Sequence, residues 1–264
     1  MDYDATLVFG GVFSSEGGDR DDLGWKSSVL EALDKFPKKG KVIGALTAPG
    51  PILLSDLNKA ADAILFNIMP GQEYAKALMN IIFGRVNPSA KLSFTMPNVE
   101  NEQQMSEAQY PGTDGHLNSS YSEKHHFGYR WYDQNKVKPL FEFGFGLSYT
   151  KFEYSALKVD NRTVTLNVKN TGKMAGSEIV QVYLGVPETE NFKDGYRSPK
   201  ALKSFFKVKD LQPGEEKEIK FFMKDRYFSY WNVEKQEWTM EQGTYNVMVG
   251  ASSRDIRMHT TMKI

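Results

Sequence analysis

The chain has 264 residues, of which 40% are hydrophobic and 25% charged, a composition typical of a globular protein with one large or two ordinary domains. Its 33 basic and 33 acidic side chains balance, which argues against nucleic acid or an anionic membrane surface as a partner. Because cysteine is absent, disulfide bonds, thiol nucleophiles and cysteine-based metal sites are excluded.

The first predicted element is a strand at residues 7–13, which is almost continuously apolar and therefore expected to be buried on both faces. A glycine-rich loop with the sequence SSEGGDR follows at residues 14–20. Ligands of open α/β sheets bind outside the carboxyl ends of the strands, so Glu16 is the sharpest candidate for a catalytic carboxylate. The alternative is a solvated acidic turn, with Asp19 and Arg20 forming a surface pair.

The rest of the first half alternates strands with helices. Apolar runs at residues 41–46 and 63–68 predict two further buried strands. Helical spacing predicts one helix from Val29, Leu30, Leu33 and Phe36, and a second from Tyr74, Ala77, Leu78, Ile81 and Ile82, with Gly84 as its C-terminal cap. This order predicts an α/β layer with a mainly parallel sheet over residues 1–97.

The second half changes its period. Residues 98–150 are rich in turns and then in aromatic residues, and are expected to form an ordered segment that wraps the α/β layer. From residue 151 to 264 apolar residues alternate with polar ones in several short runs separated by turn signals. That pattern predicts an antiparallel β-sandwich of immunoglobulin or fibronectin type.

For the histidines and the aromatic clusters, a structural role is the more frequent one. The histidines, His116, His125, His126 and His259, lack metal-ligand spacing, so no metal site is expected. Trp131, between Tyr129 and Tyr132, suits a sugar ring, although packing is the more frequent role of such a cluster. The pair Tyr230 and Trp231 is expected in the sandwich core or in packing between domains.

Several longer motifs together resemble glycoside hydrolase family 3, specifically the C-terminal part of enzymes of the β-glucosidase and β-xylosidase type. The loop SEGGDR at 15–20 resembles the acid/base loop of that family. Further similar stretches cover most of the chain: PGQE at 70–73, IFGRVNPSAKL at 82–92, GYRWY at 128–132, PLFEFGFGLSYT at 139–150, VKNTG at 168–172 and VGASS at 249–253. The resemblance implies an incomplete α/β sandwich domain followed by a fibronectin type III-like domain.

The resemblance also implies a reaction and a division of labour. It implies a retaining hydrolase of terminal β-glucosyl residues, in which Glu16 is the acid/base and an aspartate on a (β/α)8 barrel is the nucleophile. The loop neighbours Ser15, Gly17, Asp19 and Arg20 are the expected substrate contacts. No cofactor is implied. The implied partners are a β-glucoside or oligosaccharide and a barrel in cis or in trans, with neither nucleic acid nor membrane.

The chain departs from the family pattern because no barrel sequence precedes Glu16, so we expect little hydrolase activity from it alone. An exposed sheet edge and an uncovered apolar face are expected for the same reason. The alternatives are a non-catalytic carbohydrate-associated module or, within the enzyme class, a β-xylosidase or exo-glucanase. The sequence shows no signal peptide, while an extracellular or periplasmic location is usual for full-length relatives.

Overall fold

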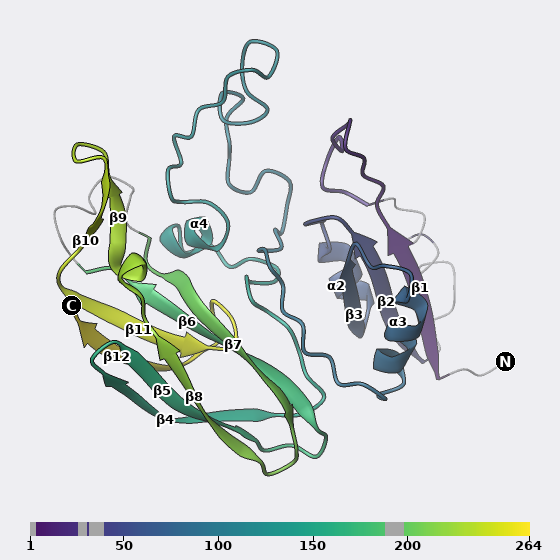
Figure 1. Cartoon of the computed structure of the whole chain (residues 1–264). Coiled ribbons are helices and arrows are strands. Elements are labelled where there is room, and N and C mark those ends of the chain that lie inside the picture. Colours follow the sequence, from purple (N-terminus) through teal and green to yellow (C-terminus); the bar gives the residue numbers. More distant parts are fainter. Residues whose placement is uncertain (1–3, 26–30, 32–39, 188–197) are drawn as a thin grey trace. The chain divides into compact units, whose positions relative to one another are not determined.

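The computed structural model describes residues 4–25, 31, 40–187 and 198–264, and the chain divides into two compact units (Figure 1). Unit 1 comprises residues 1–79, 94–119 and 139–141. Unit 2 comprises residues 80–93, 120–138 and 142–264. Residues 98–150 are thus shared between the two units. Within the described part of the chain, no helix has the length and apolarity needed to cross a membrane.

Unit 1 is built on a parallel three-stranded sheet in the order β1-β2-β3, which confirms the predicted α/β architecture. Its elements are β1 (Ala5–Gly11), β2 (Lys41–Ala48), α2 (Ser55–Ala60), β3 (Ala63–Ile68) and α3 (Tyr74–Ile82). The helix predicted from Val29, Leu30, Leu33 and Phe36 falls outside the described residues. Helix α3 ends as predicted, because Gly84 adopts a φ of +65° and donates its N–H to the Ile81 carbonyl at 2.9 Å.

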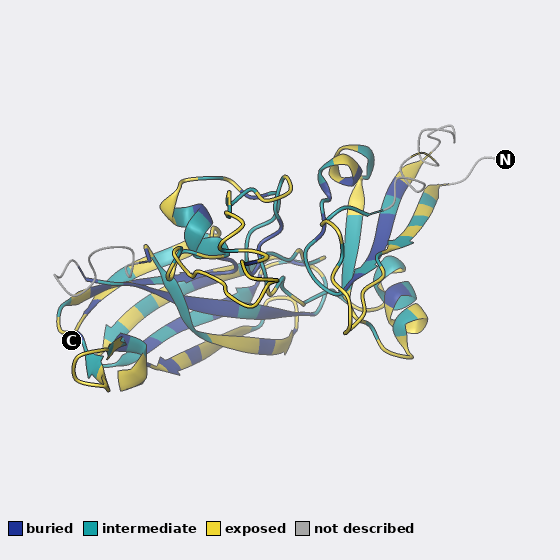
Figure 2. Cartoon of the chain, turned by 90° about the horizontal axis from the view of Figure 1, so that it is seen from above, coloured by how far each residue is buried: buried dark blue, intermediate teal, exposed yellow. Residues whose placement is uncertain are grey.

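Burial on both faces, predicted for all three strands, is confirmed for β2 alone: β3 is only partly buried and exposed at both ends. The prediction is wrong for β1. Its side chains alternate between partly buried and exposed, as the yellow and teal bands in Figure 2 show. Phe9 is 55% exposed, and Phe13, just beyond the strand, is 86% exposed. The inward side chains Val8 and Val12 pack on the core beneath β2. The expected exposed apolar face is therefore present on β1, which pairs with β2 along one edge.

Unit 2 contains the predicted antiparallel sandwich. One sheet has the order β12-β11-β6-β7 and the other has the order β4-β5-β8. The strands are β4 (Phe152–Asp160), β5 (Thr163–Asn170), β6 (Gly176–Gly185), β7 (Ala201–Leu211), β8 (Glu216–Phe222), β11 (Thr244–Gly250) and β12 (Ile256–Lys263). The alternating residues Val164, Leu166 and Val168 are fully buried between the sheets, as their period of two predicts.

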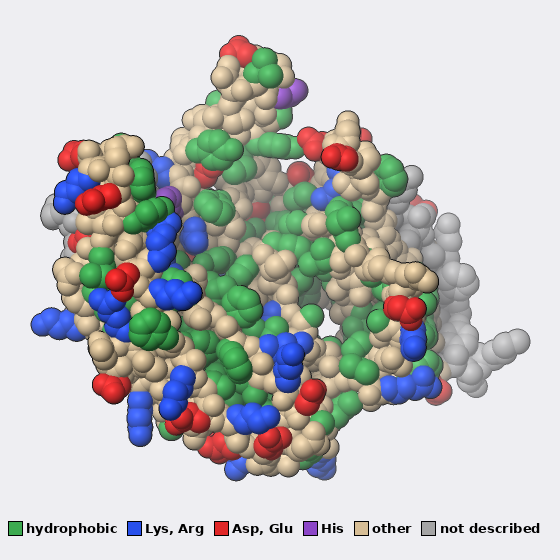
Figure 3. Space-filling view, viewed as in Figure 1, with side chains coloured by type: hydrophobic (Ala, Val, Ile, Leu, Met, Phe, Trp, Pro, Cys, Tyr) green, Lys and Arg blue, Asp and Glu red, His purple; other side chains and the backbone are tan. Residues whose placement is uncertain are grey.

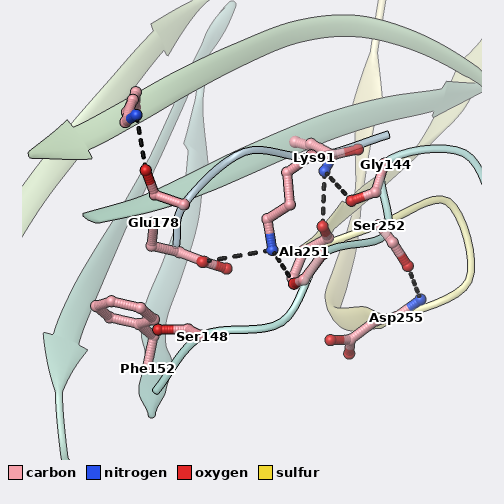
Figure 4. Close-up of polar contacts among 12 residues, drawn as sticks. Lys91, Gly144, Ser148, Phe152, Glu178, Ala251, Ser252 and Asp255 are labelled. Carbon is pink, nitrogen blue, oxygen red and sulfur yellow. Dashed lines mark hydrogen bonds and ion pairs between the residues drawn. The ribbon is translucent and has the colours of Figure 1, made fainter. Parts of the chain in front are cut away.

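Strand β6 departs from that alternation because its outer face is covered as well. Helix α4 (Tyr129–Gln134) lies over Tyr183, whose ring meets the Tyr129 ring edge-on at 6.1 Å. The Gln181 amide donates to the carbonyls of Gly144, at 3.2 Å, and Ala251, at 2.6 Å (Figure 4). The aromatic segment before the sandwich thus supplies a second packing layer.

A buried ion pair anchors the segment after α3 to the sandwich within unit 2 (Figure 4). The Lys91 ammonium lies 3.5 Å from a Glu178 carboxylate oxygen, and both side chains are at most 10% exposed. Lys91 also donates to the Gly146 carbonyl at 3.0 Å. The Tyr154 hydroxyl, whose pKa is raised by burial, donates to Glu178 at 2.8 Å. Both charges are therefore paired and hydrogen-bonded, as burial requires.

The sandwich-core interpretation of Trp231 is wrong. Trp231 lies on β9 (Ser229–Asn232), which forms a hairpin with β10 (Glu237–Met240) after the short helix η2 (Asp225–Phe228). Its ring is 44% exposed and packs on Trp238 with ring centroids 5.4 Å apart. Two strands of four residues cannot enclose two indole rings, so the hairpin presents them to solvent.

Candidate functional site

The candidate site lies at the carboxyl edge of the unit 1 sheet. Because β1, β2 and β3 run parallel, the chain segments that follow them meet at one edge. These segments are residues 12–25, 49–54 and 69–73. Figure 1 shows the first of them as the purple loop that extends beyond β1. The sequence therefore places Glu16 where open α/β sheets bind their ligands.

Glu16 occupies the tip of a tight turn. Ser15 and Gly18 form an isolated antiparallel bridge, so Glu16 and Gly17 are the two residues between its ends. Ser15, Glu16, Gly17 and Asp19 are all exposed. Glu16 makes no hydrogen bond or ion pair with any residue that the structure describes. The carboxylate is therefore presented outward without a partner from those residues.

The base of this loop is held firmly. An Arg20 guanidinium nitrogen, Nη2, donates to the Pro51 carbonyl at 3.1 Å. The Leu53 N–H donates to the Leu23 carbonyl at 2.9 Å, and the Leu23 N–H donates to Glu100 Oε2 at 2.8 Å. Contacts to two distant parts of unit 1 thus fix the loop below its tip. An anchored base with an open tip can hold a catalytic group at a defined place.

Gly17 is not explained by packing within the described chain. Neither Gly17 nor Gly18 has a positive φ, and a Cβ on Gly17 would meet nothing within 4 Å. Glycine is therefore not required at position 17 by backbone conformation or by neighbours.

Arg20 differs from its predicted surroundings. It forms no ion pair with Asp19, so the alternative of a surface pair between them is wrong. Its Nη1 is buried and has no hydrogen-bond partner among the described residues. A buried guanidinium donor without a partner is costly. This buried donor is left without an acceptor among the described residues, whereas Nη2 is engaged by Pro51.

The sequence reasoning missed the anchoring residues Pro51 and Glu100. Glu100 lies 77 residues beyond the N–H that it accepts from, and Pro51 binds Arg20 through a carbonyl that its side chain does not reveal. Neither contact has a local sequence signal. Among the described residues, no group of three or more His, Cys, Asp or Glu could hold a metal ion.

Comparisons with known proteins agree with this architecture. Residues 1–149 match the glycosyl hydrolase family 3 C-terminal domain, and residues 178–253 match a fibronectin type III-like domain. Thermostable beta-glucosidase B of Acetivibrio thermocellus is 38% identical over 282 residues, covering 99% of this chain and 36% of the relative. Beta-glucosidase BoGH3A of Bacteroides ovatus is 35% identical, covering 100% of this chain and 36% of the relative.

Solved structures give the same result. DesR, a beta-glucosidase from Streptomyces venezuelae solved in complex with D-glucose, has a TM-score of 0.88 at 34% identity, over 98% of this chain and 33% of its own. Beta-glucosidase 3B from Thermotoga neapolitana, solved with glucose, has a TM-score of 0.87 at 31% identity, over 98% and 37%. The chain spans about a third of the length of these relatives. It belongs to glycosyl hydrolase family 3, with the C-terminal and fibronectin type III-like domains of the family's beta-glucosidases.

Proposed function

We propose that this chain provides the acid/base half of a retaining β-glucosidase, with Glu16 as the proton-transferring carboxyl group. The observation that carries the proposal is the placement of Glu16 on an exposed tip whose base is anchored by Arg20 and Leu23. In the proposed reaction Glu16 protonates the glycosidic oxygen as the leaving group departs. It then removes a proton from the water that releases glucose.

The proposal requires a second carboxyl group. A retaining mechanism needs a nucleophile about 5–5.5 Å from the acid/base. No hydrogen bond links Glu16 to another carboxyl group among the described residues. We propose that an aspartate on a (β/α)8 barrel, joined in cis or supplied in trans, is this nucleophile. The barrel would also shield Glu16 from water, which an acid acting at neutral pH needs.

The open tip of the loop is consistent with a catalytic site shared between this chain and a barrel domain. Gly17 has free space around it within the described chain. This space is explained if a second domain and a sugar close over the loop. Ser15 and Asp19, exposed on the same turn, are the proposed polar contacts to that sugar.

The test joins this chain to the preceding part of thermostable beta-glucosidase B of Acetivibrio thermocellus, in place of the matching region. We expect the joined protein to hydrolyse an aryl β-glucoside and the 264-residue chain alone to be inactive. Glu16→Gln should lower kcat/KM for a poor leaving group about 10²–10⁴-fold. The loss should be smaller for 2,4-dinitrophenyl β-glucoside, since that leaving group needs no proton.

The matched control is Asp56→Asn, which removes another exposed carboxylate, on α2 in the same unit. We expect it to leave both substrates unaffected. Equal losses for Glu16→Gln with both leaving groups, or no loss, would contradict the acid/base role. Parallel assays with an aryl β-xyloside separate a glucosidase from a xylosidase. A folded joined protein that is inactive on both glycosides would favour a non-catalytic carbohydrate-associated module.

A further inference from the structure

Unit 2 carries a cluster of cations with no counter-charge among the described residues. The cluster, called here the cationic cluster, consists of Arg130 on α4, Lys203 on β7 and Arg226 on η2. Tyr129 brings the first two elements together, because its hydroxyl accepts the Leu202 N–H at 2.9 Å. In Figure 3 blue Lys and Arg side chains gather with a purple His on the face between α4 and β9.

Two cations that contact α4 from other segments, by contrast, have a counter-charge. Lys200 lies 2.6 Å from Asp133 on α4, and Arg254 lies 3.4 Å from the same carboxylate. These two cations therefore share one carboxylate as their counter-charge. No described carboxylate forms an ion pair with Arg130, Lys203 or Arg226. These three side chains therefore make this face positively charged, although the whole chain carries no net charge.

The energetic cost of this arrangement is visible at Lys203 and Arg130. Burial, followed by the charges of Arg130 and Arg226, lowers the pKa of Lys203 to about 8. The pKa of His125 is also lowered, by burial and by the charges of Arg130, His126 and Lys203. In addition, Arg130 Nε is buried and has no hydrogen-bond partner in the part of the chain that the structure describes. A bound anion would relieve both the repulsion and the unpaired donor.

Exposed aromatic rings border the cationic cluster. The Arg130 guanidinium lies 5.3 Å from the Phe127 ring centroid, and that ring is about half exposed. The Arg226 guanidinium stacks on Trp238, which is 49% exposed and packs against Trp231. Aromatic faces suit the apolar face of a pyranose, whereas guanidinium groups suit oxyanions. A ligand with both features matches this surface.

We propose that the cationic cluster and its aromatic border form a binding site for an acidic saccharide, with the carboxylate of a uronic acid between Arg130, Lys203 and Arg226. The proposal that an anion binds here is independent of the function proposed above. The proposal that this anion belongs to a saccharide rests on that function. The site would hold an acidic glycan on the sandwich, in addition to the glucosyl unit proposed at Glu16. Binding there requires no hydrolysis.

The experiment measures binding by isothermal titration calorimetry on the intact 264-residue chain at pH 7 and low salt. The probes are trigalacturonate, neutral cellotriose and inorganic sulfate. We expect trigalacturonate to bind at least about tenfold more tightly than the other two, since only it combines charge with pyranose faces. Lys203→Met and Arg226→Gln should each weaken it about tenfold, the usual size of a charged hydrogen bond. Lys220→Met, an exposed lysine on β8, should have no effect.

Each remaining outcome contradicts the proposal. Absence of trigalacturonate binding overturns the site. Equal binding of sulfate overturns the saccharide part, and equal binding of cellotriose overturns the role of the cations. Unchanged affinity in both cluster variants places any binding elsewhere. Thermal unfolding of Arg226→Gln serves as the control for folding. We expect this variant to unfold like the wild-type chain, because Arg226 is an exposed side chain on the short helix η2. A failure here leaves the role of Glu16 untouched, since no step at Glu16 is measured.

Discussion

The sandwich of unit 2 and the sheet of unit 1 bury their apolar side chains to different extents. In the sandwich, the inward residues of both sheets, such as Leu166 and Val182, are completely buried by other strands of the same unit. In unit 1 the central strand β2 is buried, but Phe9 on β1 is exposed. The difference indicates that the sandwich is a self-contained core, whereas the sheet that carries Glu16 leaves apolar surface exposed.

The largest effect on stability is expected from breaking the Lys91–Glu178 pair inside unit 2. Lys91→Met leaves Glu178 buried without its counter-charge, so unfolding of the sandwich should become easier by about 3–5 kcal/mol. Replacing both residues with methionine should recover much of this loss. Calorimetry on the two variants checks the prediction. Equal losses in the single and double variants would show that the charge left unpaired is not the cause.

A pair of apolar truncations compares the two units directly. Leu166→Ala opens a cavity in the sandwich core and should cost about 2–5 kcal/mol. Phe9→Ala removes a larger side chain from the exposed face of β1 and should change stability by about 0.5 kcal/mol or less. Chemical denaturation of both variants measures the contrast. A large loss from Phe9→Ala would mean that β1 is covered within the chain itself.

A smaller effect is expected at Lys203, and it depends on pH. Its pKa is about 8 when folded and 10.5 when unfolded, so below pH 8 folding bears the full cost of the buried charge. Between pH 8 and 10.5 the unfolded state binds more protons, and stability rises with pH. Lys203→Met should therefore stabilise the sandwich at pH 7, on the order of 1–2 kcal/mol because the side chain remains partly hydrated.

This stabilisation should shrink as the pH rises from 8 towards 10.5. Thermal unfolding of the wild-type chain and Lys203→Met across that range provides the measurement. Lys220→Met, which removes an exposed lysine, should show no such dependence on pH. A constant difference between wild type and Lys203→Met at all pH values would contradict the assigned cause.

The smallest effect on stability is expected at Gly17. Gly17→Ala meets open space and requires no positive φ, so stability should change by about 0.5 kcal/mol or less. In the joined protein, however, the added methyl group lies beside Glu16 and should lower kcat/KM for the aryl glucoside about tenfold. Unaltered kinetics in Gly17→Ala would mean that neither the sugar nor a second domain closes over this position.

Local periodicity predicted much of this fold. The alternation of Val164, Leu166 and Val168 corresponds to their burial, and Gly84 ends α3 as its position after the helical pattern indicated. The family motif at residues 15–20 located a loop at the carboxyl edge of the sheet. These features depend on residues that are close in sequence, so their signals are local.

The errors concern contacts between distant segments. The outer face of β6 is buried because Gln181 and Tyr183 are covered by residues before the sandwich, which no period within β6 reveals. Trp231 is exposed because its hairpin is too short to enclose it. The anchoring of Arg20 depends on the Pro51 backbone carbonyl. Such contacts arise from tertiary packing, and they decide the burial of a residue more strongly than its side-chain type does.

The most direct test of the central claim uses azide with Glu16→Gln in the joined protein and an activated aryl β-glucoside. If Glu16 is the acid/base, the variant forms the glucosyl-enzyme but cannot activate water, and azide needs no such activation. We predict that azide restores turnover and that the product is β-glucosyl azide, with retained configuration. No rescue by azide, or an α-configured product, would contradict the assignment of Glu16 as the acid/base of a retaining enzyme.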